Sequence, residues 1–448
     1  MLADSTLSGN AASVYDELTL IRSELDRCMK CGNCMAVCPV YGTDKLEGGV
    51  ARGKVSVTEA ILAGNLQLDD PKVYEMLFNC IVCKSCMQNC PTKVNFDRIM
   101  LAIRAALVRK KGVPWVKKMI FSMLKNPVLF DKGMKLGAAL QGLAFRDFES
   151  KEQKLIAPRT PFTWVGRGAG MDSGKVMPEL AVRTLRDRVP DVVTVANPKT
   201  RIAFFTGCSL NYFYPETGLD IVEIMKENRV ETHIPKDQYC CGIAVFAHGD
   251  VESARTLAKN NIDAIEKSGA EYIVAGCGSC GGSLMHDYKE LLGSDPVYGQ
   301  KAEYWSARVH EVSSFLVNII KYRKPAGQLS PVTVTYHDSC HLKKTMKVFN
   351  EPREIINNIP GVTLKEMSKP DNCCGMGGTY ILTHYETGSE IGRKKMQDIN
   401  NTGADVITTG CPGCAMQLLD LSHRHGKKQP VKHYIQLLAE AYRKEQKH

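Results

Sequence analysis

The spacing of the cysteines constrains this chain more than any other feature. Eighteen cysteines occur in 448 residues, and most fall in tight C-x-x-C groups instead of being scattered through loops as disulfide frameworks are. A chain of this length can bury a large core without disulfides. The first residues, MLADSTLSGN, lack the basic and apolar regions of a signal peptide. The sequence therefore predicts metal ligands in the reducing cytoplasm.

Two runs in the first hundred residues share the pattern C-x2-C-x2-C-x3-C-P, which holds cubane [4Fe–4S] clusters in two-cluster ferredoxins. Three cysteines of each run bind one cluster, and the fourth binds the other cluster. We expect one cubane on Cys28, Cys31, Cys34 and Cys90, and a second on Cys80, Cys83, Cys86 and Cys38. A pair of zinc sites is the weaker alternative, because zinc takes four ligands per ion without crossing between runs.

Apolar residues recur at helical spacing in VSVTEAILAGNLQL and DPKVYEMLF, between the two runs. Residues 1–111 therefore resemble the helical ferredoxin domain in iron–sulfur subunits of succinate dehydrogenase and its relatives. Arg52 and Lys54 either place positive charge near a cluster, which would raise its potential, or belong to a solvated turn.

Residues 112–200 form a basic and apolar helical segment followed by a linker. Pro114 and Pro127 divide the segment into helices. These helices either lie on anionic lipid or a membrane partner, or pack on the next domain or a soluble subunit. Residues 147–200, with PRTPFTWVGRGAGMDSGK, are expected to be an extended linker.

Charge and hydropathy argue against a membrane-spanning helix and against nucleic-acid binding. No run approaches the roughly 18 consecutive apolar residues of a membrane-spanning helix. The formal charge of +10 is spread along the chain, which argues against nucleic-acid binding.

The remaining ten cysteines reveal an internal duplication. The gaps between successive ligands are 32, 36 and 3 positions in one unit and 33, 37 and 3 in the other. The ligands follow short β-branched runs, and strands alternate with helices, which predicts two α/β units with parallel sheets at 201–328 and 329–448. Cysteines at the strand ends are expected to meet at one crevice in each unit. The five in the first unit are Cys208, Cys240, Cys241, Cys277 and Cys280, and those in the second are Cys340, Cys373, Cys374, Cys411 and Cys414.

The pattern C-x(n)-C-C-G-x(n)-C-x-x-C resembles the CCG domain of heterodisulfide reductases and of the iron–sulfur subunits of glycolate and lactate oxidases. The resemblance covers nearly the whole chain. It implies an α+β multidomain protein, with a helical two-cluster ferredoxin domain before two α/β CCG domains. It also implies that each five-cysteine set holds a noncubane [4Fe–4S] cluster.

Two branches of this family imply different functions. The segments CMKCGNCMAVCPVYG, FFTGCSLNYFYPETG and CCGMGGTYILTHYETG are similar to subunits that accompany a flavin-linked 2-hydroxyacid dehydrogenase. That likeness implies a relay of single electrons from an FAD-containing partner to a quinone-linked acceptor or membrane cytochrome, peripheral to the cytoplasmic face of the membrane. The alternative is the catalytic subunit of a disulfide reductase, whose two noncubane clusters face one cavity and each deliver an electron to one sulfur. In that case Cys208, Cys240, Cys241, Cys340, Cys373 and Cys374 would be catalytic.

The remaining candidates are polar residues near the cysteines. The chain has no G-x-G-x-x-G after a strand, so we expect the flavin on a partner. His341, His337, His286 and His384 are either proton donors to a cleaved thiolate or hydrogen-bonded structure. Lys343 and Lys344 either attract an anionic substrate or lie on a solvated face. A third class, a scaffold that clusters only stabilise, needs fewer cysteines than these.

Overall fold

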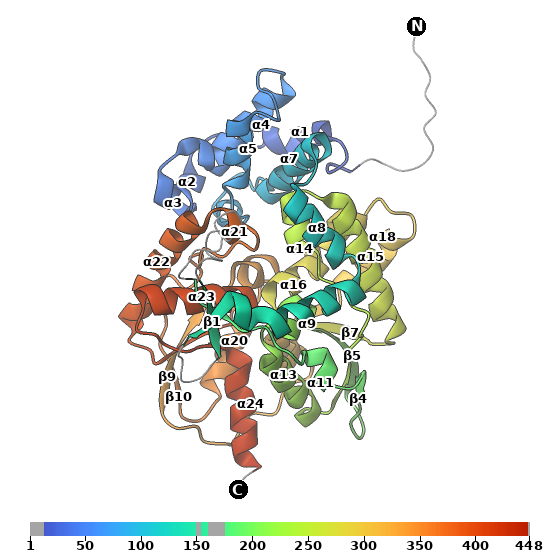
Figure 1. Cartoon of the computed structure of the whole chain (residues 1–448), viewed down its shortest axis with the longest axis vertical. Helices are drawn as coiled ribbons and strands as arrows, with labels where there is room; N and C mark the ends of the chain where they lie inside the picture. The colour runs from blue at the N-terminus through green and yellow to red at the C-terminus, as the bar shows by residue number, and fades with distance from the viewer. Residues whose placement is uncertain (1–12, 149–153, 160–174, 447–448) are drawn as a thin grey trace.

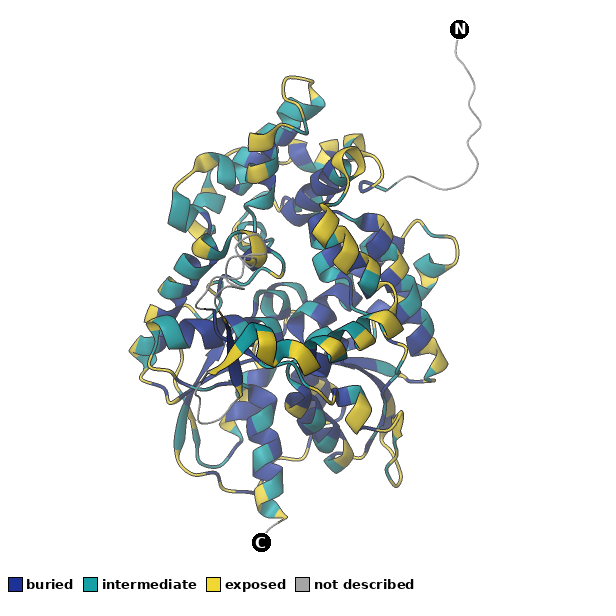
Figure 2. Ribbon diagram, in the orientation of Figure 1, coloured by how far each residue is buried: buried dark blue, intermediate teal, exposed yellow. Residues whose placement is uncertain are grey.

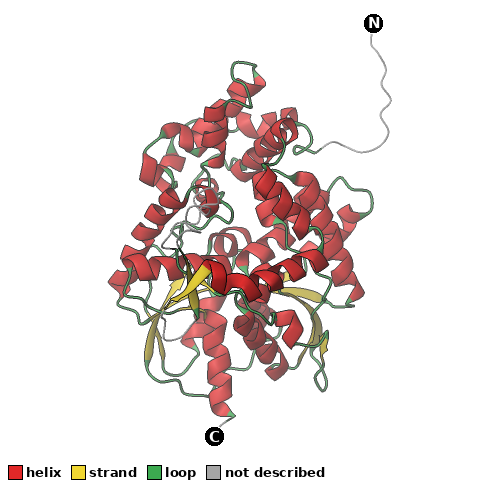
Figure 3. Ribbon diagram, viewed as in Figure 1, coloured by secondary structure: helices red, strands yellow, loops and turns green. Residues whose placement is uncertain are grey.

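The computed structural model describes residues 13–148, 154–159 and 175–446. Figure 1 shows a helical N-terminal part above two sheet-containing units, and Figure 3 shows the two parallel sheets side by side beneath it. The first part contains η1 (Leu18–Ile21), α1 (Arg22–Asp26), α2 (Asn33–Val37), α3 (Tyr41–Asp44), η2 (Glu47–Gly49), α4 (Ala51–Leu62), α5 (Pro71–Phe78), α6 (Ser85–Gln88) and α7 (Phe96–Lys111).

The helices of this part follow from their sequence. Pro71 occupies the first turn of α5, and the Asp70 side chain accepts hydrogen bonds from the backbone N–H of Lys72 at 2.8 Å and of Val73 at 3.3 Å. Helix α7 carries mostly buried residues along its first three turns and three basic residues in its last, where they favour the helix dipole. The helical connection between the two cysteine runs is thus confirmed.

The basic and apolar segment forms α8 (Trp115–Leu124) and α9 (Pro127–Ala144), which begin at the two prolines. Part of the stretch expected as a linker is ordered instead. Strands β1 (Phe145–Phe148), β2 (Leu155–Pro158) and β3 (Met177–Pro178) form an antiparallel sheet, followed by α11 (Leu185–Arg188) and β4 (Val192–Val193). The apolar run LIAP is buried in β2, and its short length hid it among glycines and prolines. Residues 160–174 lie outside the described part of the chain.

The first unit orders its sheet as β4-β6-β5-β7-β8, parallel except for β4. Cα partners between β5 and β7 include Phe205 and Ala275. Its remaining elements are β5 (Thr200–Phe205), α12 (Gly207–Tyr212), α13 (Pro215–Glu227), β6 (Val230–His233), α14 (Ile243–His248), α15 (Val251–Lys267), β7 (Tyr272–Ala275), α16 (Gly278–Gly282), η3 (Ser283–Asp287), α17 (Tyr288–Leu292), α18 (Tyr298–Ser306), β8 (Val309–Glu311), α19 (Val312–Ser314) and η4 (Phe315–Ile319).

The second unit orders its sheet as β10-β9-β11-β12, all parallel. Its elements are β9 (Val332–His337), η5 (His341–Thr345), α20 (Glu351–Asn357), β10 (Val362–Leu364), α21 (Tyr380–Thr383), α22 (Tyr385–Thr402), β11 (Val406–Thr409), α23 (Pro412–His425), β12 (Val431–His433) and α24 (Tyr434–Glu445). The order β6-β5-β7-β8 is repeated as β10-β9-β11-β12, so the duplication in the sequence is a duplication of topology. The expectation of two parallel α/β units is confirmed.

The core runs through all three parts of the chain. Figure 2 shows buried positions concentrated in the sheets and in the helix faces that cover them. One apolar cluster joins the helices of the first part to the first sheet, and another joins the two sheets to each other. Helix α13 packs on α24, where Arg443 pairs with Asp220 at 2.8 Å. No helix in the described ranges is long and apolar enough to cross a bilayer.

Arg104 of α7 fixes the helical part on the first unit. Its buried guanidinium donates hydrogen bonds to the carbonyl oxygens of Leu77 and Cys80 at 2.8 and 2.9 Å and of Ala247 at 2.7 Å. Burial lowers the pKa of Arg104, while these three carbonyls accept hydrogen bonds from all three of its nitrogens. Helix α14 ends at the next residue, His248, and is followed by Gly249, whose φ is +100°.

A substitution at Gly249 tests how closely the backbones of α7 and α14 must approach each other. A Cβ at this position would lie 2.5 Å from the Arg104 carbonyl carbon and oxygen, whereas Gly269, with φ +64°, has no atom within 4 Å. Gly269→Ala should cost about 1 kcal/mol from backbone strain alone. Gly249→Ala should cost about 1–3 kcal/mol more because backbone atoms must shift. Thermal unfolding of the holoprotein checks this, and equal melting temperatures for the two variants would contradict the fixed approach.

Candidate functional site

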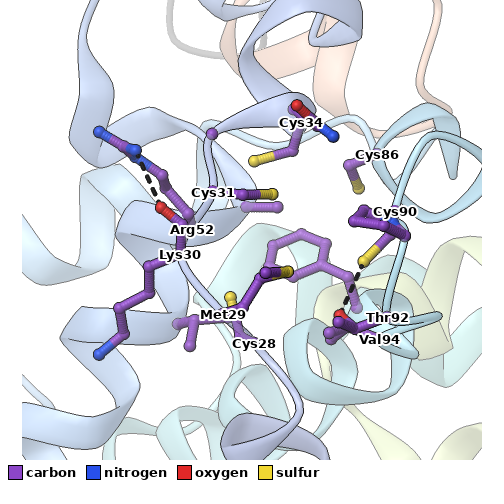
Figure 4. Close-up of a pocket in the computed structure, with 16 residues that line it drawn as sticks. Cys28, Met29, Lys30, Cys31, Cys34, Arg52, Cys86, Cys90, Thr92 and Val94 are labelled. Carbon is purple, nitrogen blue, oxygen red and sulfur yellow. Dashed lines mark hydrogen bonds between the residues drawn. The ribbon is translucent and has the colours of Figure 1, made fainter.

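Two pockets in the helical part are each lined by four of the expected cysteines. The first has a volume of about 40 Å³ and is lined by Cys28, Cys31, Cys34 and Cys90, and also by Cys86 of the second run. Figure 4 shows the sulfur atoms around one central space. The second, of about 30 Å³, is lined by Cys38, Cys80, Cys83 and Cys86. Three cysteines of one run and the last cysteine of the other therefore meet in each pocket.

The backbones of the two runs bend at the same places. The third and fifth positions of both runs have positive φ: Lys30 at 55° and Gly32 at 86°, and Val82 at 55° and Lys84 at 62°. Only glycine adopts this region readily, and a β-branched valine there is strained. The loop that wraps a pocket is therefore held in a costly conformation by its surroundings.

Charged residues lie close to both pockets. Arg52 lines the first and donates a hydrogen bond to the Lys30 carbonyl at 3.1 Å. Lys54 is 1% exposed, and its ammonium group donates to the carbonyl of Asn79 at 3.2 Å, beside the second pocket. Burial lowers the pKa of Lys54, whereas Cys80 and Cys38 raise it. For Arg52 and Lys54, one of the two alternatives was a solvated turn. Lys54 is buried and therefore does not belong to one.

All ten remaining cysteines line one cavity of about 230 Å³ between the two units and the helical part. Cys208 and Cys277 follow β5 and β7, and Cys340 and Cys411 follow β9 and β11 at the equivalent strand ends. The paired cysteines of each CCG sequence instead lie on loops after β6 and β10. Gly242 and Gly375, with φ of 86° and 87°, turn the chain after each pair in the same way. The structure therefore has one cavity shared by the two units, in place of the expected crevice in each unit.

The two units meet through their sulfurs. The Sγ atoms of Cys277 and Cys411 lie 3.9 Å apart, and the Gly278 N–H donates a hydrogen bond to the Gly410 carbonyl at 3.2 Å. Ser279 adds a link, with its Oγ 3.6 Å from Cys411 Sγ. Ser279 is a residue that sequence reasoning did not single out, although its position inside C-x-x-C was a signal.

The helical part closes the cavity and brings its second pocket against the second unit. Cys83 is buried in a small apolar cluster against which Cys340 and Cys373 pack. Lys84 and Asp97 line the cavity as an ion pair 2.7 Å apart, with exposures of 10% and 5%. No pattern in the sequence indicates this pair, because only the docking of the helical part places it there.

The four histidines considered from the sequence separate into two pairs. His341 and His337 line the cavity. His341 Nδ1 lies 3.3 Å from Ser279 Oγ, and burial, together with Lys84, lowers the pKa of His341. His286 and His384 do not line it: His286 is next to Asp287, and His384 stacks on Tyr380 with ring centroids 4.7 Å apart.

The two lysines after Cys340 also differ. Lys343 lies 3.3 Å from Asp338 in an ion pair. Lys344 is 6% exposed and donates a hydrogen bond to Ser85 of the helical part at 2.5 Å, so it is not on a solvated face.

The chemistry of the donors fits thiolate-bound iron. All eighteen cysteines lie in the described ranges, and none is in a disulfide. Burial raises the pKa of Cys38 to about 11 and that of Cys340 to about 12. Such thiols would remain protonated at neutral pH unless a cation bound them, and a coordinated metal ion removes the proton.

Comparison with known proteins agrees with this arrangement. Residues 24–94 match the 4Fe-4S dicluster domain, and residues 202–285 and 334–419 each match the cysteine-rich domain called CCG. The probable glycolate oxidase iron–sulfur subunit of Bacillus subtilis is 29% identical over 442 residues, covering 93% of this chain and 94% of that protein.

Two further relatives represent the two branches. Lactate utilization protein A of Halalkalibacterium halodurans is 31% identical over 238 residues, covering 53% of this chain and 96% of that protein. A subunit of the dihydromethanophenazine:CoB–CoM heterodisulfide reductase of Methanosarcina barkeri is 26% identical over 448 residues, covering 93% of this chain and 94% of that protein. The chain therefore belongs to the CCG-domain iron–sulfur proteins, and in this chain a 4Fe-4S dicluster domain precedes two cysteine-rich domains.

Proposed function

We propose that this chain relays single electrons between a flavin-linked 2-hydroxyacid dehydrogenase-type partner and a quinone-linked acceptor. The relatives named for glycolate oxidase and lactate utilization support an electron-transfer role and this class of partner. Iron–sulfur clusters supply one-electron steps when bound. The proposed compartment is the reducing cytoplasm, where thiols remain available to iron.

The proposed ligands are the cysteines that line each space. One cubane [4Fe–4S] cluster would be held by Cys28, Cys31, Cys34 and Cys90, and a second by Cys38, Cys80, Cys83 and Cys86. Two noncubane clusters would be held by Cys208, Cys240, Cys241, Cys277 and Cys280, and by Cys340, Cys373, Cys374, Cys411 and Cys414.

The spatial order of the four sulfur sites carries this proposal. Cys86 borders both pockets of the helical part, Cys83 lies against Cys340 and Cys373, and Cys411 contacts Cys277. The sites therefore form a series from the first pocket to the second pocket, then to the second CCG unit, and last to the first CCG unit.

The outer end of the series is the first pocket. Cys31 is exposed, and the neighbouring Met29 side chain is 63% exposed. At the other end, Cys277 and Cys280 are each 5% exposed. A protein that exchanges electrons with the chain would therefore dock over Cys31.

Electron injection at the first pocket tests the series. A ruthenium photoreductant attached through Met29→Cys delivers one electron beside Cys28, and the resulting cluster signals are followed by freeze-quench electron paramagnetic resonance (EPR). We expect the electron to reach the CCG sites in the holoprotein. In Cys83→Ser it should stay on the signal of the first pocket, because the site between them is lost.

The matched control is Val297→Ser, an exposed position that lines none of the three cysteine pockets. Cys83→Ser must also remove the same EPR signal that Cys38→Ser removes, which shows that only the second pocket has changed. Unaltered arrival of the electron at the CCG sites in Cys83→Ser would overturn the proposed series.

The shared cavity favours a second candidate, disulfide reduction. Ten cysteines, five from each unit, line this one space, so that two clusters held there would face each other across it. The reaction is R–S–S–R′ plus two electrons and two protons, which breaks the S–S bond and gives RSH and R′SH. The cysteines considered for it are Cys208, Cys240, Cys241, Cys340, Cys373 and Cys374, with His341 as the candidate proton donor.

A substitution that fills the cavity distinguishes electron relay from disulfide reduction. Ala244 lines it from α14 without being a thiol, so Ala244→Phe should block a disulfide while leaving the cluster signals unchanged. With a reduced viologen as electron donor, disulfide reduction predicts two thiols released for every two viologen radicals oxidised, and loss of this release in Ala244→Phe. If the chain only relays electrons, neither the wild-type protein nor Ala244→Phe releases thiol from any disulfide tested.

A further inference from the structure

The two CCG units are not chemically equivalent, because His337 stands where the first unit has Phe205. Both residues end a central strand and lie three positions before the first cysteine of their unit. His337 pairs with Thr409 across β9 and β11, as Phe205 pairs with Ala275 across β5 and β7. The second site therefore has a nitrogen donor at a place where the first has a hydrocarbon ring.

One ring nitrogen of His337 is already used. Its Nδ1 lies 3.2 Å from the Pro370 carbonyl oxygen, and because a carbonyl only accepts, Nδ1 is the N–H donor. The side chain is 1% exposed, and Nε2 has no hydrogen-bond partner among the described residues. A backbone carbonyl on one nitrogen is the usual way in which a metal-ligating histidine is oriented, with the other nitrogen facing the metal.

The imidazole of His337 lies beside two cysteine sulfurs of its own unit. A ring nitrogen of His337 and the Sγ atoms of Cys374 and Cys414 all lie within 4.8 Å of one another, and all three residues are buried. Sulfur and imidazole donors at this separation suit one iron ion. We propose that His337 Nε2 is an iron ligand of the second CCG site, which then has six protein donors where the first has five.

This proposal rests on the proposed function, since it requires that the second site hold iron. It is tested by pulsed EPR on the full-length holoprotein labelled with ¹⁵N-histidine. We expect a strongly coupled histidine nitrogen on the second-site signal, and its loss in His337→Phe, which installs the residue of the first unit. His341→Phe, in the same cavity, is the matched control and should keep the coupling.

The outcomes are distinguishable. Full iron content without a strongly coupled nitrogen would overturn the histidine ligand and leave the proposed function standing. If the coupling is lost in His341→Phe but kept in His337→Phe, the coupled nitrogen belongs to His341, and the proposal for His337 is overturned. Absence of iron from the second site would remove both proposals.

A second inference comes from the outer surface of α8 and α9. Of the 21 large hydrophobic residues that are exposed in the described chain, nine lie on these two helices. Figure 2 shows exposed positions along both of them. The nine are Trp115 (77%), Leu143 (70%), Val128 (61%), Leu136 (61%), Met119 (53%), Leu129 (51%), Leu140 (49%), Ile120 (40%) and Val116 (39%).

The inner face of this pair of helices is fixed to the protein. Phe121 and Leu124 of α8 are buried, and Phe130 packs edge-to-face on Tyr212. Gln141 exchanges two hydrogen bonds with the backbone of Leu180, at 2.9 and 3.1 Å. The apolar outer face is therefore presented by rigid helices and does not turn inward.

The charges on this face indicate its partner. The exposed basic residues of this segment are Lys118 on α8, Lys132 on α9 and Lys125 between the two helices. The one acidic residue of these helices, Asp131, accepts a hydrogen bond from Tyr212 and pairs with Lys135 at 2.9 Å. Protein interfaces are depleted in lysine, whereas helices that lie in a bilayer interface combine lysines with leucine and tryptophan. We infer that the α8–α9 face docks on an anionic lipid surface.

Vesicle flotation of the full holoprotein tests this inference. We expect binding to vesicles with 30% phosphatidylglycerol in phosphatidylcholine, and little binding to pure phosphatidylcholine or in high salt, because screening removes the attraction. Leu136→Glu with Leu143→Glu should lower the bound fraction about tenfold or more, because each leucine otherwise buries apolar surface in the bilayer. The matched control is Val297→Glu, an exposed apolar position elsewhere, which should bind as wild type does.

Three results would overturn the lipid surface. Wild-type protein that does not float with the anionic vesicles has no such affinity. Equal flotation with neutral and anionic vesicles removes the role of the lysines. A dimer that dissociates in the Leu136→Glu, Leu143→Glu variant identifies a second copy of the chain as the occupant instead.

Discussion

The contact between the two parallel sheets at their carboxyl ends is the constraint on which the rest of the structure depends. Cys277 and Cys411 can lie 3.9 Å apart only because the equivalent strand ends of both units face the same space. The backbone hydrogen bond from Gly278 to Gly410 holds that approach. Once the sheets face each other, the cysteines on the intervening loops have no other space to line, and one cavity results.

Docking of the helical part then places one of its two cysteine pockets against the cavity and the other away from it. Arg104 binds carbonyl oxygens on both sides of the junction with the first unit, and Lys344 reaches Ser85 from the second. A buried guanidinium is costly unless all its donors are used. Because the junction satisfies them, the pocket of Cys83 is held against Cys340 and the exposed pocket of Cys31 is held away from the cavity.

Much of this could be predicted from the sequence, because ligand spacing is a local property. The crossed sets of four, the two five-cysteine groups and the parallel α/β units all follow from repeated patterns over short distances. The shared cavity did not follow. Its width depends on how Gly278 meets Gly410, residues 132 positions apart, and no pattern in either unit encodes the orientation of the other.

Other features of the structure could not be predicted from the sequence either. Lys84 and Asp97 belong to the helical part and line the cavity only through docking, so their sequence neighbourhood indicates no site. The strand Leu155–Pro158 is too short for its apolar run to stand out beside glycines and prolines. Ser279 was visible inside its C-x-x-C group, but its link to His341 crosses between the units.

Duplication followed by divergence accounts for the asymmetry between the two units. The equivalent cysteines, the equivalent glycines with φ near +86° and the equivalent strand order are retained in both repeats. Some of the residues that differ contact something outside their own repeat. Lys344 contacts Ser85 of the helical part and His341 contacts Ser279 of the first unit, both from the π-helix η5 after Cys340. A π-helix shifts side chains out of regular α-helical register and is frequent at functional sites. The second unit therefore contacts both the helical part and the first unit through η5, directly beside its own sulfur site.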